Sequence, residues 1–271
     1  MAPQLIDRKQ LKAEMKTLLA DAQVSPKGIT ALYCALELAI SMALAFAPAK
    51  GTASTFLSIF STLLITVLFA GFVLYCMAVR RNERAEYLTL FDGFAFAGKL
   101  IGLALMISIR VALWSMVFVI PGIVTAYRYR FALYNLYENP GIGILQAMNM
   151  SRVQTIGYKA QLFSLDLSYI GWGLLTSLPI AVESGLLSME ITAAVLSGAT
   201  QMPSEFALYS VLPGWGWVLL SGLWTLMVSM FYLPVKTCTE LGYFEIAKQT
   251  SGVGFNPDAQ SAGSNNEWDS D

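Results

Sequence analysis

Long apolar runs bounded by charged residues, or by proline and glycine, dominate the pattern of the chain. A helix needs about 20 mainly apolar residues to cross a bilayer. The segment 100–137 is too long for one ordinary helix, and Pro121-Gly122 divides it, because proline followed by glycine breaks a helix. The pattern therefore predicts six spans, at about residues 29–47, 56–79, 100–120, 123–137, 160–182 and 212–235.

The segments outside these runs are polar or amphipathic. Residues 1–28 predict an amphipathic helix, because Leu11, Met15, Leu18 and Ala22 recur at helical spacing. This helix lies either on the cytoplasmic leaflet or against the protein's own cytoplasmic loops. The run Ile191–Leu196 is too short to cross, and the final residues, 249–271, predict a disordered cytoplasmic tail.

Basic residues test this count of spans through the positive-inside rule. Six spans place both termini in the cytoplasm and leave Lys50 as the one basic residue outside. A single crossing over 100–137 would instead move Arg152 and Lys159 outside. The distribution favours a multi-pass protein of the cell (plasma) membrane. The basic residues that then face inward are Arg8, Lys9, Lys12, Lys16, Lys27, Arg80, Arg81, Arg84, Lys99, Arg152, Lys159, Lys236 and Lys248.

Composition supports an integral membrane protein and excludes several function classes. Hydrophobic residues make up 56% of the 271 residues and charged residues only 13%, against roughly 25% charged residues in soluble domains. A net charge of −1 gives no sign of nucleic-acid binding. Histidine is absent, and the three cysteines show no C-x-x-C spacing. The sequence therefore predicts an all-α polytopic membrane bundle, with no catalytic, cofactor-binding or metal-binding residue.

Residues 119–172 carry an ordered series of short motifs. IPGIV is followed by YRYRFALYNLYENP, by an amphipathic helix containing AMNMSR, and by GYKAQLFSLDLSYIGWGLL. With LFDGF at 90–94 and LPVKTCTELGYFE at 233–245, this order resembles a bacterial multi-pass membrane family catalogued as domain of unknown function nine-seven-five. The resemblance covers about residues 5–248 and implies a fold and a bacterial membrane location, but no activity.

Five charged residues lie inside the predicted spans: Glu37, Arg110, Arg128, Arg130 and Asp166. A charge at a helix centre costs about 2.5–3.5 kcal/mol on insertion scales, so such residues usually pair or line a cavity. At a rise of about 1.5 Å per residue, Glu37 and Arg110 lie at the same depth, and Asp166 lies near the level of Arg130. We expect two ion pairs, Glu37 with Arg110, and Asp166 with Arg130 or Arg128.

Three hypotheses for function follow. The favoured one is a non-enzymatic membrane component, or a regulator of a membrane complex, whose charge pairs are structural. The alternative is a small-solute or proton-coupled transporter, in which a hydrated cavity would reach Glu37 or Asp166. A lipid-modifying membrane enzyme is the least favoured. The predicted partners are the lipid bilayer and either another membrane protein or further copies of the chain.

Overall fold

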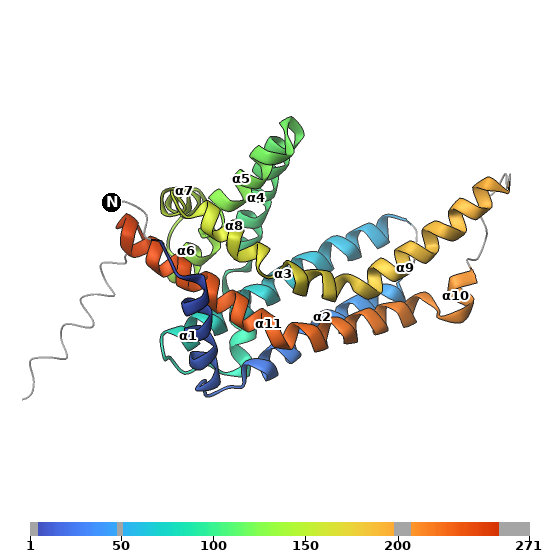
Figure 1. Ribbon diagram of the computed structural model, residues 1–271, viewed down its shortest axis with the longest axis horizontal. Helices are drawn as coiled ribbons and strands as arrows, with labels where there is room; N and C mark the ends of the chain where they lie inside the picture. Colours follow the sequence, from blue (N-terminus) through green and yellow to red (C-terminus); the bar gives the residue numbers. More distant parts are fainter. Residues whose placement is uncertain (1–4, 48–50, 198–206, 255–271) are drawn as a thin grey trace, which may run out of the picture. The chain divides into compact units, whose positions relative to one another are not determined.

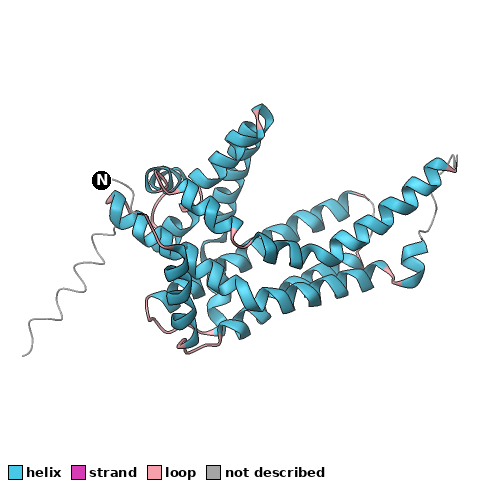
Figure 2. Cartoon of the chain, in the orientation of Figure 1, coloured by secondary structure: helices cyan, strands magenta, loops and turns pink. Residues whose placement is uncertain are grey.

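The computed structural model describes residues 5–47, 51–197 and 207–254. All regular structure in these ranges is helical, which confirms the all-α class (Figure 2). The helices are α1 (Arg8–Ala20), α2 (Pro26–Ala45), α3 (Thr52–Arg80), the 3-10 helix η1 (Tyr87–Phe96), α4 (Ala97–Val117), α5 (Val119–Arg128), α6 (Ala132–Glu138), α7 (Ile144–Gln154), α8 (Lys159–Leu167), α9 (Ile170–Leu196), α10 (Ala207–Val211) and α11 (Gly214–Ser251).

The chain forms two compact units, and α1 and α11 each contribute residues to both. The first unit gathers Met1–Lys12, Ala95–Asp166 and Thr239–Asp271, and the second gathers Ala13–Phe94 and Leu167–Cys238. Since α11 continues to Ser251, the predicted tail starts later than residue 249. From residue 255 onward that prediction lies outside the described residues.

Five segments of the described chain are long and apolar enough to cross a membrane: Pro26–Ala45, Thr52–Arg80, Tyr87–Val117, Ile170–Leu196 and Gly214–Ser251. Lengths of 20 to 38 residues meet or exceed the requirement of about 20 residues. The chain is therefore a multi-pass membrane protein.

The predicted span 160–182 differs most from the structure. Helix α8 ends at Leu167, and α9 begins at Ile170 and continues to Leu196. The predicted span ends directly before Glu183, whereas α9 continues past it. Here Tyr209 Oη donates to Glu183 at 3.3 Å, and the backbone N–H of Leu208 donates to Glu190 at 2.8 Å. Glutamate is a good helix former, so the helix continues through both positions, and both carboxylates accept hydrogen bonds.

The segment 100–137 does turn back on itself, but at another residue. The turn lies at Phe118, whose backbone is extended, and Pro121 falls in the first turn of α5. Proline is tolerated there because the first helical N–H groups have no partner within the helix. Helices α4 and α5 lie side by side (Figure 1), with Gly122 close to Ser115. The predicted returning helix 123–137 is also interrupted, since α5 ends at Arg128 and α6 begins at Ala132.

The first unit has a small core between α4, α6 and α7. Its fully buried members are Leu103, Ala132, Leu136, Ala147 and Met148. Each short helix contributes one apolar face to this core, which positions the turn between α5 and α6 for the contacts described below.

The second unit contains α2, α3, α9 and the first part of α11, seen together in Figure 1. Gly222 of α11 lies against the side chain of Leu38 in α2. On another face of α11, Trp224 Nε1 donates to the carbonyl oxygen of Leu175 in α9 at 2.7 Å. Helix α11 therefore contacts both α2 and α9.

Helix α1 packs on the protein through an apolar stripe. Leu11, Met15 and Leu19 are buried, at spacings of four residues. In the second unit, Arg80 of α3 donates to the sulfur of Met15. This burial favours the alternative in which α1 lies against the protein itself.

The close approach of η1 to α3 gives a first prediction. A Cβ atom at Gly71 would collide with the backbone carbonyl of Leu90, whereas a Cβ at Gly98 would meet nothing within 4 Å. We expect Gly71→Ala to lower the free energy of unfolding by about 2 kcal/mol, because backbone cannot move aside as a side chain can. Thermal unfolding in detergent measures this. Gly98→Ala is the control and should leave the midpoint unchanged or slightly higher, and equal midpoints for the two variants would contradict the close approach.

Candidate functional site

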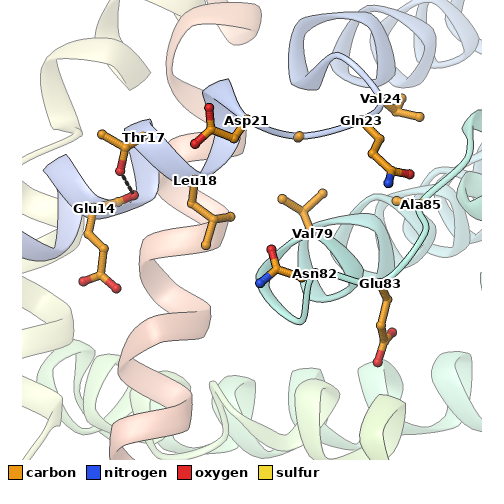
Figure 3. Close-up of a pocket in the computed structure, with 11 residues that line it drawn as sticks. Glu14, Thr17, Leu18, Asp21, Gln23, Val24, Val79, Asn82, Glu83 and Ala85 are labelled. Carbon is orange, nitrogen blue, oxygen red and sulfur yellow. Dashed lines mark hydrogen bonds between the residues drawn. The ribbon is translucent and has the colours of Figure 1, made fainter.

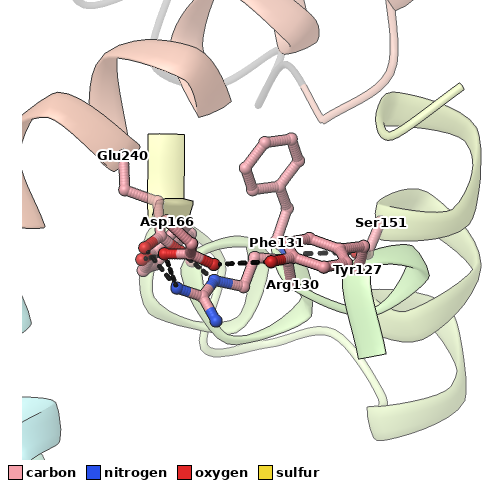
Figure 4. Close-up of polar contacts among 7 residues, drawn as sticks. Tyr127, Arg130, Phe131, Ser151, Asp166 and Glu240 are labelled. Atoms are coloured by element: carbon pink, nitrogen blue, oxygen red, sulfur yellow. Dashed lines mark hydrogen bonds and ion pairs between the residues drawn. The ribbon is translucent and has the colours of Figure 1, made fainter. Parts of the chain in front are cut away.

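Arg130 and two carboxylates from separate elements of the first unit lie together (Figure 4). Arg130 lies in the turn between α5 and α6, Asp166 in α8 and Glu240 in α11. Arg130 Nε donates to Glu240 Oε1 at 2.6 Å, and Arg130 Nη2 donates to Glu240 Oε2 at 2.8 Å. Arg130 Nη2 also lies 3.5 Å from Asp166 Oδ1. The guanidinium therefore forms a two-point contact with one carboxylate and a longer contact with the other.

Two tyrosines complete this group. Tyr127 Oη donates to Asp166 Oδ2 at 2.8 Å, and Tyr134 Oη donates to Glu240 Oε1 at 2.7 Å. Each carboxylate thus receives a phenol hydrogen bond in addition to its contact with Arg130. Since one cation faces two anions, these neutral donors help to stabilise the second negative charge. We call Arg130, Asp166, Glu240, Tyr127 and Tyr134 the Arg130 network.

Hydrogen bonds to the backbone hold the turn that carries Arg130. Ser151 Oγ accepts from the backbone N–H of Phe131 at 3.1 Å and donates to the carbonyl oxygen of Arg128 at 2.9 Å. Thr155 Oγ1 donates to the same carbonyl at 3.3 Å. Helix α7 and the residue that follows it therefore fix both ends of the turn that carries the guanidinium.

The burial and hydrogen bonding of the Arg130 network are typical of a contact that holds helices together. The side chain of Glu240 is only 7% exposed, against 26% for Asp166 and 35% for Arg130. A buried carboxylate held by two donors on the guanidinium and one phenol is well compensated, and removal of one member leaves a costly charge. The arrangement therefore joins α6, α8 and α11 within the first unit.

The structure brings together Arg130 and Asp166, the contact expected from the sequence. Both residues lie outside the five candidate spans. Arg110 of α4 donates to Tyr129 Oη at 3.0 Å, and its guanidinium lies 5.5 Å from the centre of that ring. Glu37 belongs to the second unit and Arg110 to the first, so their pairing stays a prediction.

Arg128, the remaining predicted residue, belongs to a second group of charges in the first unit. Burial lowers the pKa of Lys159, and the positive charges of Arg128 and Arg152 lower it further. Like charges disfavour protonation of a neighbouring lysine. These three residues therefore form a cluster of mutually repelling cations, which we call the cationic triad.

Glu37 lines a cavity of about 150 Å³ in the second unit. Cys34, Glu37 and Ser41 of α2 contribute to its wall, together with Ser221 and Thr225 of α11. Ser221 Oγ donates to the carbonyl oxygen of Val218 at 3.1 Å, which leaves its lone pairs available to a bound group. The cavity therefore places one carboxylate among neutral oxygen atoms inside the candidate spans.

A larger pocket, of about 440 Å³, lies in the second unit between α1 and the end of α3 (Figure 3). Glu14, Asp21 and Glu83 contribute carboxylates to its lining, and Asn82 stands at the end of α3 with a positive φ of 53°. Among the described residues, no group of three or more histidine, cysteine, aspartate or glutamate side chains has the arrangement of a metal site.

Sequence reasoning missed Glu240, the most buried charge of the network. Glu240 follows the last predicted span, so it was not counted among the intramembrane charges. The sequence does indicate a buried position for Glu240, because its neighbours in TCTELGYF are small or apolar. Tyr127 and Tyr134 carried no such signal, since tyrosine is common near membrane interfaces.

Comparison with known proteins identifies one family. The model of a family described as protein of unknown function (DUF975) matches residues 116–251, a region that contains the whole Arg130 network. No curated protein matches the chain, and no solved structure matches it.

The network predicts unequal effects of its two carboxylates. We expect Glu240→Gln to lower the free energy of unfolding by about 2 kcal/mol, because Arg130 loses the anion of its two-point contact. Asp166→Asn should cost less, since its contact with Arg130 is longer and more exposed. Thermal unfolding in detergent compares the two variants. Arg84→Gln, an exposed position in the second unit, is the control, and a larger loss for Asp166→Asn than for Glu240→Gln would contradict this account.

Proposed function

Because the chain belongs to the DUF975 family of proteins of unknown function, we propose its role from the geometry of its own side chains. We propose that it is a non-enzymatic membrane component that assembles, through α9, with another membrane protein or with a second copy of itself. Its proposed location is the cell membrane with both termini in the cytoplasm, because the basic residues then face inward.

The exposure of α9 carries this proposal. Although α9 has 27 residues, it contains no buried residue. Its mean hydropathy over the most apolar window is 1.4, against 2.4 for α3, and it is the lowest of the five candidate spans. The least apolar span is thus also the least covered by its own chain. A lipid-facing helix would instead be expected to be strongly apolar.

One side of α9 presents small residues to the outside. Ser177, Ala181, Ser184 and Ser188 recur at spacings of four, three and four, and all are exposed. The hydroxyl groups of the three serines donate to carbonyl oxygens of α9 itself, at 2.8–3.0 Å. Small residues at this spacing allow close approach of a second membrane helix. We call these four residues the small face of α9.

The Arg130 network supports a non-enzymatic role. A general acid or base needs a proton position that a substrate can reach. Here Asp166 and Glu240 already accept hydrogen bonds from Tyr127 and Tyr134 and face Arg130. These charges therefore stabilise the fold of the first unit.

Photo-crosslinking tests the small face. A photoreactive phenylalanine analogue at Ser184, in the full chain in native membranes, should give a protein–protein adduct. The same analogue at Met189, exposed on another side of α9, is the matched control and should label lipid. Mass spectrometry of the adduct identifies either a second copy or another membrane protein. Lipid adducts alone at both positions would overturn the proposal.

A second candidate function, a cation-coupled carrier, is favoured by one observation. The cavity around Glu37 lies between α2 and α11 in the candidate spans, and it is lined by a carboxylate and several hydroxyl groups. A volume of about 150 Å³ holds a few water molecules or one small cation, since a water occupies about 30 Å³. Intramembrane carboxylates commonly mark ion or proton pathways.

Flux in proteoliposomes checks the carrier function. With a pH-sensitive dye inside the vesicles, wild type should carry protons or small cations down an imposed gradient, and Glu37→Gln should abolish this flux by removing the charge. Glu183→Gln, in α9 and outside the cavity lining, is the control and should retain the flux. Equal flux for Glu37→Gln and wild type, or flux no greater than that of empty liposomes, would exclude this role.

A further inference from the structure

We propose that the cationic triad of Arg128, Arg152 and Lys159 binds the phosphate headgroup of an anionic membrane lipid. The site lies in the first unit, at the turn that joins α7 to α8. It is independent of the proposed assembly through α9 and of the cavity around Glu37.

Hydrogen bonds at the end of α7 bring the three residues together. Ser151 Oγ and Thr155 Oγ1 both donate to the carbonyl oxygen of Arg128, so the end of α5 is fixed against the last turn of α7. Arg152 lies in that last turn. Thr155 and Tyr158 close the turn through a backbone hydrogen bond of 3.2 Å, and Lys159 follows as the first residue of α8. Three cations from α5, α7 and α8 are therefore gathered at one turn.

Their mutual repulsion indicates a place for an anion. Lys159 is partly buried, and its pKa is lowered first by desolvation and then by the charges of Arg128 and Arg152. An anion bound beside these three like charges offsets their repulsion. Two guanidinium groups and one ammonium match the several acceptor oxygens of a phosphate.

Apolar side chains beside the triad point to a lipid as the source of that phosphate. Val153 and Ile156 are 43% and 65% exposed, and they lie between Arg152 and Lys159 in the sequence. A free anion would need no exposed apolar residues next to its site. Basic residues beside exposed apolar residues are typical of a helix that lies at the membrane interface and contacts headgroups. Charge complementarity thus favours an anionic lipid over a neutral one.

Native mass spectrometry of the purified full chain tests the site. From micelles containing phosphatidylglycerol and phosphatidylcholine in equal amounts, wild type should retain phosphatidylglycerol preferentially. Each of Arg128→Gln, Arg152→Gln and Lys159→Gln should weaken this retention about fivefold, since a basic residue near an anionic surface contributes about 1 kcal/mol. Arg84→Gln, an exposed arginine in the loop between α3 and η1, is the charge-matched control and should retain the lipid as wild type does.

One further measurement distinguishes a lipid headgroup from a free phosphate. A second distinguishes lipid binding by Lys159 from a structural role of this residue. Soluble glycerol phosphate in excess should not displace the lipid, and displacement at millimolar concentration would show a site for a free anion instead. In neutral detergent without lipid, Lys159→Gln should unfold at a higher temperature than wild type, because repulsion is relieved. Added phosphatidylglycerol should stabilise wild type more than this variant. Equal stabilisation of the two, or equal loss of lipid in Arg84→Gln, would overturn the proposal.

Discussion

The contact between Arg130 and Glu240 is the interaction on which the first unit depends. It joins residues 110 positions apart in the chain, through two hydrogen bonds of 2.6 and 2.8 Å. Glu240 would be costly there without Arg130, because an unpaired charge at a buried position costs several kcal/mol. Asp166, Tyr127 and Tyr134 extend the same contact to α8, α5 and α6. Short helices are thereby held in a defined arrangement.

Close backbone contact has the corresponding role in the second unit. Glycine at position 71 allows η1 to lie directly against α3, and Gly222 allows α11 to approach Leu38 of α2. In a bilayer the lipid tails are as apolar as the helices, so packing rather than hydrophobic burial stabilises helix pairs. The same reasoning explains why α9, with a small face and no buried residue, is the span best suited to an external helix.

The two groups of charge in the first unit have opposite character. In the Arg130 network, anions and a cation compensate one another, and phenol hydrogen bonds occupy oxygen atoms that remain. In the cationic triad the charges have one sign, and the pKa of Lys159 is lowered first by burial and then by the charges of Arg128 and Arg152. A compensated group stabilises the fold by itself, whereas a repelling group is stabilised by an added anion. This contrast separates a structural role from a binding role within one unit.

The sequence by itself determined the class of the protein, most of the spans and one charge pair. Apolar runs of sufficient length need no tertiary information, because the bilayer imposes their length. The tertiary structure decided where charged residues find partners. Glu183 lies inside α9 and accepts a hydrogen bond from Tyr209 Oη, and Arg130 pairs with Glu240 more closely than with Asp166. Such contacts join residues far apart in the chain, and the periodicity of a single helix carries no information about them.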